Sequence, residues 1–144
     1  MFLENYFVEE DNNKWLNTLN LQQQDTINKL LSKNSEDEVI TIWLNSLNIN
    51  TATYNGGNTD FTYSNLFKNE VIKLLCGDKK YKVERGEINN LYNSTNIKKA
   101  IITYVSGVIA SQLNVSSTSI APVVVLMFII ISKLSLNAWC QLNK

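Results

Sequence analysis

Apolar residues recur at helical spacing along most of the chain. Two clusters in the first third share spacings of one to four residues, which place their members on one helix face: Trp15, Leu16 and Leu19, and then Ile27, Leu30 and Leu31. This spacing is typical of amphipathic helices. Asp11 or Asn12 can cap the first helix and Asn20 the second, because a short polar side chain accepts a hydrogen bond from the first turn.

The clearest helix start is Ser35-Glu36-Asp37-Glu38. A serine followed three residues later by glutamate forms a capping box, and acidic residues in a first turn complement the helix dipole. The helix that it opens carries apolar residues at helical spacing: Val39, Ile40, Trp43, Leu44 and Leu47.

Residues 49–60 have no apolar periodicity and hold Asn-Gly-Gly-Asn at their centre, so they predict a loop. The short runs 51–54 and 60–63 could pair as a hairpin across it, or the loop could lead straight into a helix. We therefore predict one domain over residues 1–144. N-terminal helices occupy 1–48, a loop occupies 49–60, and a C-terminal helical core occupies 61–144.

A strong amphipathic helix follows the loop, with one face made of Leu66, Phe67, Glu70, Val71, Leu74 and Leu75. Gly77 is suited to end this helix, because glycine adopts the left-handed conformation found just beyond many helix ends. Residues 81–92 predict a further short helix whose inward positions are Val83, Ile88, Leu91 and Tyr92.

No charged residue occurs between Ala100 and Ser132. The span holds two apolar pieces, residues 100–110 and 120–131, separated by the polar segment SQLNVSSTS. Proline is tolerated in a first helical turn, so Thr118 or Ser119 is expected to cap a helix that contains Pro122. Residues 134–142 are expected to continue the same helix.

The two apolar pieces predict a hydrophobic helical hairpin at the centre of an all-α fold, a compact bundle of about six or seven helices. Lys98 and Lys99 before the first piece and Lys133 after the second would then lie at one end. At about 11 and 12 residues, neither piece reaches the roughly 20 that a membrane span needs. The hairpin could be a core, a self-association surface or a membrane-inserting device. The side chains expected to carry it are Ile101, Val105, Val108, Val124, Phe128, Ile131 and Trp139.

Composition restricts the partners. Only 18% of residues are charged, below the usual value of about 25%, and the formal net charge is zero. Such a surface permits self-association and does not favour nucleic acid, whose binding needs a surplus of lysine and arginine. The best basic cluster is interrupted by Glu84 and Glu87, and reads as a solvated loop and helix start: Lys79, Lys80, Lys82 and Arg85.

No catalytic pattern is present. The chain has no histidine, its serines therefore lack the usual base, and its consecutive acidic residues point to different sides of a helix. Cys76 and Cys140 match no metal spacing, and their apolar surroundings favour two small buried side chains, with a disulfide left open. We predict no enzyme, cofactor or metal site; an enzyme built on tyrosine, arginine and carboxylates is the least favoured alternative. The segment MFLENYFVEE lacks a basic leader, which favours the cytoplasm.

Two resemblances bear on function. The apolar pair inside a helical bundle resembles the buried hairpin of colicin-type pore-forming domains. LLCGDKKY (74–81), Arg85 and the run IAPVVVLMFIIISKLSLNAWC resemble small helical proteins of bacterial defence and conflict gene clusters. The second resemblance implies a non-enzymatic adaptor that acts through contacts with other proteins. The uncharged polar surface and the surplus of apolar helix add the expectation that it self-associates. The first resemblance implies the alternative, a pore-forming effector whose segment 100–131 inserts into a membrane.

Overall fold

The computed structural model describes residues 2–8, 12–47 and 63–144 of the chain. Over these ranges the protein is all-α, which confirms the predicted fold class. Eight α-helices are described: α1 (Asn12–Leu16), α2 (Leu21–Leu31), α3 (Glu36–Ser46), α5 (Tyr63–Cys76), α6 (Lys82–Asn89), α7 (Ile97–Leu113), α8 (Ser117–Leu134) and α9 (Leu136–Leu142). Three short 3-10 helices join them: η1 (Phe2–Tyr6), η3 (Lys79–Tyr81) and η4 (Asn90–Asn93).

Several helix boundaries follow the local signals in the sequence. The Asn20 side chain accepts a hydrogen bond from the Gln23 N–H at 2.8 Å, so α2 starts where predicted. The capping box is complete, since the Ser35 and Glu38 side chains each accept a bond from the other residue's N–H. Gly77 has a φ of +102° at the end of α5. The predicted loop 49–60, the hairpin across it and the Asp11 cap lie outside the described residues.

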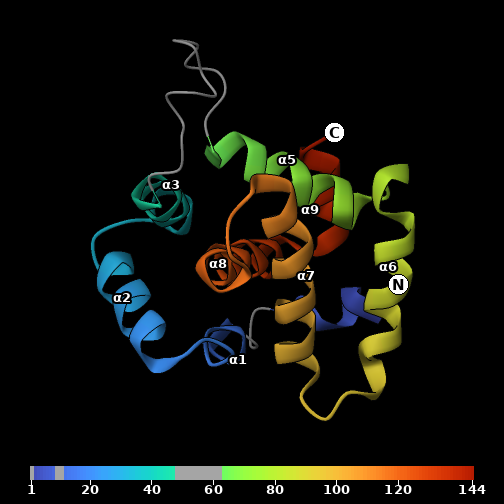
Figure 1. The fold of residues 1–144 in the computed structure, drawn as a ribbon, viewed down its shortest axis with the longest axis horizontal. Coiled ribbons are helices and arrows are strands. Elements are labelled where there is room, and N and C mark those ends of the chain that lie inside the picture. The colour runs from blue at the N-terminus through green and yellow to red at the C-terminus, as the bar shows by residue number, and fades with distance from the viewer. Residues whose placement is uncertain (1, 9–11, 48–62) are drawn as a thin grey trace.

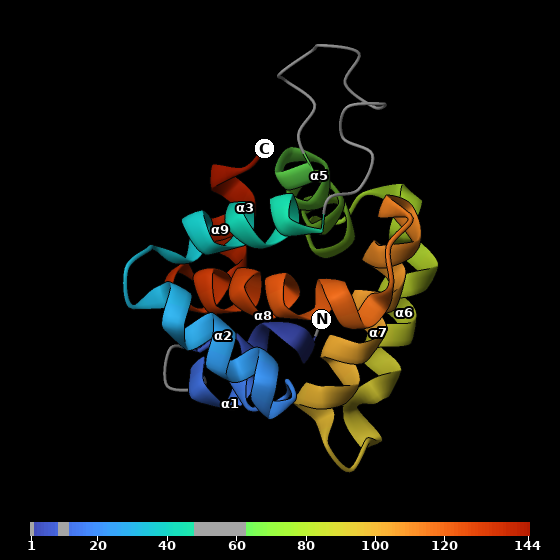
Figure 2. The same ribbon diagram turned by 60° about the vertical axis from the view of Figure 1, so that its left-hand side comes forward.

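Helix α8 is the centre of the molecule. Figure 2 shows it crossing the middle of the bundle, with α3 on one side, α1 and α2 on the other, α7 at its start and α9 at its end. Its apolar run is buried almost throughout, and Val123, Val124 and Val125 have no exposed surface. A helix that is apolar on nearly all sides is stable in water only when other helices enclose it.

Helices α7 and α8 pack against each other as the sequence predicted, but α8 crosses α7 instead of running back beside it (Figures 1 and 2). The lysines expected together at one end of a hairpin consequently have different partners. The Lys98 ammonium lies 4.7 Å from the centre of the Tyr6 ring and 5.2 Å from that of Trp15. Lys133 forms an ion pair with Glu36 at the start of α3.

The start of α8 differs from the prediction. Ser116, rather than Thr118 or Ser119, is the N-cap, and its hydroxyl accepts from the Ser119 N–H at 3.3 Å. Pro122 therefore lies in the second helical turn, where its missing N–H leaves the carbonyl of Thr118 without a helical donor. The side-chain amide of Gln23 supplies that donor at 2.9 Å. A long-range contact thus compensates for a proline inside the central helix.

The helix does not continue to Leu142, so that prediction is wrong. Ser135 has a φ of +89° and separates α8 from α9. Its hydroxyl accepts from the Ala138 N–H at 3.2 Å and so caps α9. The change of direction brings Cys140 beside Cys76, where the two form a disulfide that joins α9 to α5. The cysteines are a covalent cross-link, not two independent apolar side chains.

Candidate functional site

The residues expected to carry the hairpin belong to the core. Ile101, Val105, Val124, Phe128 and Ile131 have no exposed surface, Trp139 is 3% exposed, and Val108 is half-buried. The Phe128 ring makes edge-on contacts with the rings of Phe7 and Trp15, at centre distances of 4.9 and 5.0 Å. These side chains hold the helices together. The six buried residues therefore offer no contact surface in the folded protein.

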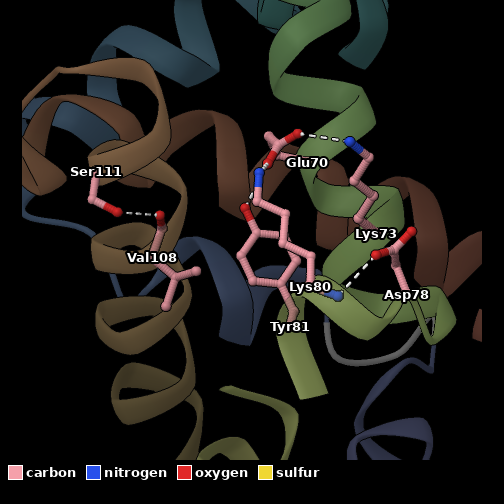
Figure 3. A network of polar contacts seen from close by, with 7 residues as sticks. All are labelled: Glu70, Lys73, Asp78, Lys80, Tyr81, Val108 and Ser111. Atoms are coloured by element: carbon pink, nitrogen blue, oxygen red, sulfur yellow. Dashed lines mark hydrogen bonds and ion pairs between the residues drawn. The ribbon is translucent and has the colours of Figure 1, made fainter. Parts of the chain in front are cut away.

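A polar network occupies the corner between α5 and η3 (Figure 3). Glu70 is only 9% exposed, and one of its carboxylate oxygens accepts from the Lys80 ammonium at 2.5 Å and from the Tyr81 hydroxyl at 2.6 Å. Lys73, one turn further along α5, lies 3.6 Å from the other carboxylate oxygen. The buried carboxylate is therefore paired with charge and hydrogen-bonded, as burial requires.

These contacts fix the protonation states. Burial alone would raise the pKa of Glu70, but the hydrogen bonds from Lys80 and Tyr81 and the nearby lysine charges hold it below its ordinary value of 4.5. Burial and the bond to Glu70 raise the pKa of Tyr81 well above its ordinary value of 10.0. At neutral pH Glu70 is ionised and Tyr81 is protonated. The network is suited to holding η3 against α5. Neither the Glu70 carboxylate nor the Tyr81 hydroxyl has a pKa near 7, so neither is suited to acid–base catalysis at neutral pH.

Arg85 completes this corner. Its guanidinium donates to the carbonyls of Lys73 and Leu74, both at 3.1 Å, and to that of Asp78 at 2.6 Å. The last carbonyls of a helix have no helical donor and carry the negative end of its dipole, so an arginine there is stabilising. The charges of Asp78, Lys80 and Arg85 therefore act within the fold. Two neighbours predicted to point inward are instead exposed, Val83 at 72% and Tyr92 at 59%.

Two surface hollows meet at the start of α8. One, of about 270 Å³, lies between α7, α8 and the α1–α2 corner, and a second, of about 340 Å³, lies between α2, α3 and α8. Asn20, Gln23 and Thr118 line both. We call the two together the α8 groove, formed by Thr18, Leu19, Asn20, Gln22, Gln23, Thr26, Trp43, Leu47, Lys99, Ile102, Thr103, Ser106, Ser117, Thr118, Ser119 and Ala121.

The groove is polar but nearly uncharged. Its lining is dominated by amides and hydroxyls, with Trp43 in one half and Lys99 in the other. The Trp43 indole N–H donates to the Ser119 carbonyl at 2.8 Å, so the ring is held against the first turn of α8. Gln23, bonded to the Thr118 carbonyl, stands where the two hollows meet.

Sequence reasoning missed this groove. The groove is formed around two helix starts, Asn20 to Gln23 and Ser116 to Ser119. In the sequence each looks like an ordinary capped helix N-terminus, and nothing marks it as part of a groove. The two segments are 95 residues apart at the Gln23–Thr118 bond. The predicted cap would place Pro122 in the first helical turn, where no donor is missing; only the actual start at Ser116 leaves the Thr118 carbonyl in need of Gln23.

Comparisons with protein-family models, curated proteins and solved structures find no match to this chain. Among the described residues, no three histidine, cysteine, aspartate or glutamate side chains gather in a way that could hold a metal ion. The geometry of the chain itself is therefore the basis for a functional proposal.

Proposed function

We propose that this protein is a non-enzymatic interaction module of a bacterial defence or conflict system that associates with a second copy of itself through the α8 groove. The observation that carries the proposal is the groove's lining, which combines a half-buried tryptophan with uncharged amides and hydroxyls. The cores of protein interfaces are depleted in charge and enriched in aromatic side chains. Short amides and hydroxyls add hydrogen bonds that adapt to the partner surface.

The rim of the groove supports the same proposal. Leu21 is 81% exposed, and its neighbours Asn20 and Gln22 both line the groove. A large apolar side chain at that position gains free energy when a partner covers it. The zero net charge of the chain adds no long-range repulsion between two copies.

The test compares two strongly exposed apolar residues, Leu21 and Val83, by size-exclusion chromatography with light scattering. Leu21→Glu places a charge beside the groove, whereas Val83→Glu places one on α6, across the molecule from α2 (Figure 1). Neither side chain is buried, so both variants should keep the fold. We expect Leu21→Glu to lower the mean mass and Val83→Glu to leave it unchanged. A wild type that stays monomeric at its highest soluble concentration would contradict the proposal.

One observation favours a second candidate, a membrane-active effector. Helix α8 has 18 residues with a mean hydropathy of 2.0, and at about 1.5 Å per residue it is about 27 Å long, close to the thickness of a bilayer core. The apolar run at residues 120–131, which is too short to span a membrane, is shorter than α8, the helix that contains it. Of this helix, 61% is buried, as in the core helix of a soluble protein.

The disulfide suggests how to test the second candidate. Because Cys140 follows α8 closely and is bonded to Cys76, α8 cannot leave the bundle without carrying α5 along or losing the bond. An inserting protein should therefore release dye from anionic vesicles faster after reduction, with the oxidised protein as its own control. No release in either state, at neutral or acidic pH, would reject this candidate.

A further inference from the structure

We propose that the α7 side of the α8 groove is a binding site for a single carboxylate, held by Lys99, the first turn of α8 and the buried hydroxyl of Ser106. The site is the hollow of about 270 Å³. This ligand site goes beyond the proposed self-association, in which the groove contacts a second copy of the protein. It can be tested with a soluble ligand on the monomer.

The first turn of α8 presents donors and positive potential to this hollow. Ser117 and Thr118 line it, and within the described parts of the chain their N–H groups have no acceptor. The N-terminus of an 18-residue helix also carries the positive end of the helix dipole. Free N–H groups combined with that dipole favour an anion over a neutral ligand.

The buried hydroxyl of Ser106 is independent support for a ligand in this hollow. It is 1% exposed, it lines the hollow, and in the described structure its hydroxyl has no hydrogen-bond partner. Two other serines in the interior of these helices donate back to a carbonyl of their own helix. Ser111 donates to Val108 at 2.8 Å (Figure 3) and Ser132 to Phe128 at 2.8 Å. A buried hydroxyl left unpaired is costly, and a bound acceptor oxygen would remove that cost.

The charge and the donor groups of the site suit one carboxylate. Lys99 is the sole charged residue among those that line the hollow in the described structure. It shares a face of α7 with Thr103 and Ser106, at spacings of four and three residues. One ammonium and about half a positive charge from the helix dipole make the site attractive to an anion. The Lys99 ammonium, the Ser117 and Thr118 N–H groups and the Ser106 hydroxyl are four donor groups, and a carboxylate offers about four acceptor positions on its two oxygens. The ligand is therefore a monocarboxylate, either free in solution or at the C-terminus of a peptide.

The site is tested by amide NMR titrations at constant pH and ionic strength and at protein concentrations that give a monomer. The probes are sodium acetate, and acetyl-trialanine with either a free or an amidated C-terminus, against sodium chloride and inorganic phosphate. We expect the largest shifts at the N–H groups of Ser117 and Thr118. Binding of acetate alone assigns a free carboxylate. Stronger binding of the free-acid peptide than of its amide assigns a peptide terminus.

Three variants locate the ligand. Lys99→Gln should weaken carboxylate binding at least tenfold, and Ser106→Ala several-fold. Lys98→Gln should leave it unchanged, because that ammonium lies over the Tyr6 and Trp15 rings. The proposal is overturned if Lys98→Gln and Lys99→Gln act alike, if phosphate binds more tightly than carboxylate, or if chloride gives the same shifts. A failure of self-association leaves these titrations unaffected, so the two proposals fail separately.

Discussion

Removing the cross-link between α5 and α9 should destabilise the protein strongly. Cys76 and Cys140 are 64 residues apart in sequence, and the segment between them includes the central helix α8. In the oxidised protein the unfolded chain must keep this long loop closed, which restricts its conformations. The double variant Cys76→Ala, Cys140→Ala frees the unfolded chain. Alanine suits both positions because each cysteine is half-buried among apolar neighbours.

The magnitude follows from the loop length. For a separation of 64 residues, the chain-entropy relation gives about 14 cal/mol/K, or about 4 kcal/mol at room temperature. In a domain of this size that loss lowers the melting temperature by roughly 10–15 °C. Because the effect acts on the unfolded state, the denaturant m value of the variant should also increase, since a chain without the cross-link exposes more surface.

Urea denaturation followed by circular dichroism measures both quantities. The wild type in reductant should match the double variant, and reductant should not change the variant further. Mass spectrometry without reductant first establishes whether the thiols of the purified, air-exposed protein are oxidised. Free thiols at that stage would refute the pairing. A stability loss below about 1 kcal/mol with an unchanged m value would refute the loop-entropy reasoning.

Three further predictions concern packing and protonation. Phe128→Ala should destabilise the fold by about 3–5 kcal/mol in urea denaturation, because the ring is fully buried; a loss under about 1 kcal/mol would mean that the core is not packed as described. Glu70→Gln should lower the free energy of unfolding at neutral pH, and the difference from wild type should shrink as the pH falls below 4.5. The reason is that a carboxyl whose pKa is lowered by folding stabilises the folded state only while it is ionised. A difference that does not change with pH contradicts this reasoning. Gln23→Ala should cost about 1 kcal/mol, and less in a Pro122→Ala background, where the new N–H can donate to Thr118; equal costs in both backgrounds would exclude the compensation.

The helix pattern was predictable because its signals are local. The capping box at Ser35 and Glu38 and the cap at Asn20 each involve residues within one helical turn. The left-handed Gly77 likewise ends α5 without help from distant segments. The helix break at Ser135 was missed because serine rarely has a φ of +89°, and no local preference indicates it.

The α8 groove could not be predicted in the same way. Its two halves come from helix starts that are far apart in the chain, and each start satisfies its own local rule. Ser106 offered no signal either, since a serine in an apolar helix ordinarily bonds to its own backbone. The buried role of Glu70 depends on Lys80 and Tyr81, which reach it only after Gly77 turns the chain.

The sequence by itself determined that this protein is helical, where several of its helices begin, and that the run from Ile120 to Ile131 must be covered. Apolar spacing and caps act over a few residues, so the unfolded chain already contains that information. Only the tertiary structure decided how α8 crosses α7, that Cys76 meets Cys140, and that Gln23 supplies the donor missing at Pro122. Each of those depends on segments that become neighbours when the whole core forms, because burial is satisfied by the shape of the entire bundle.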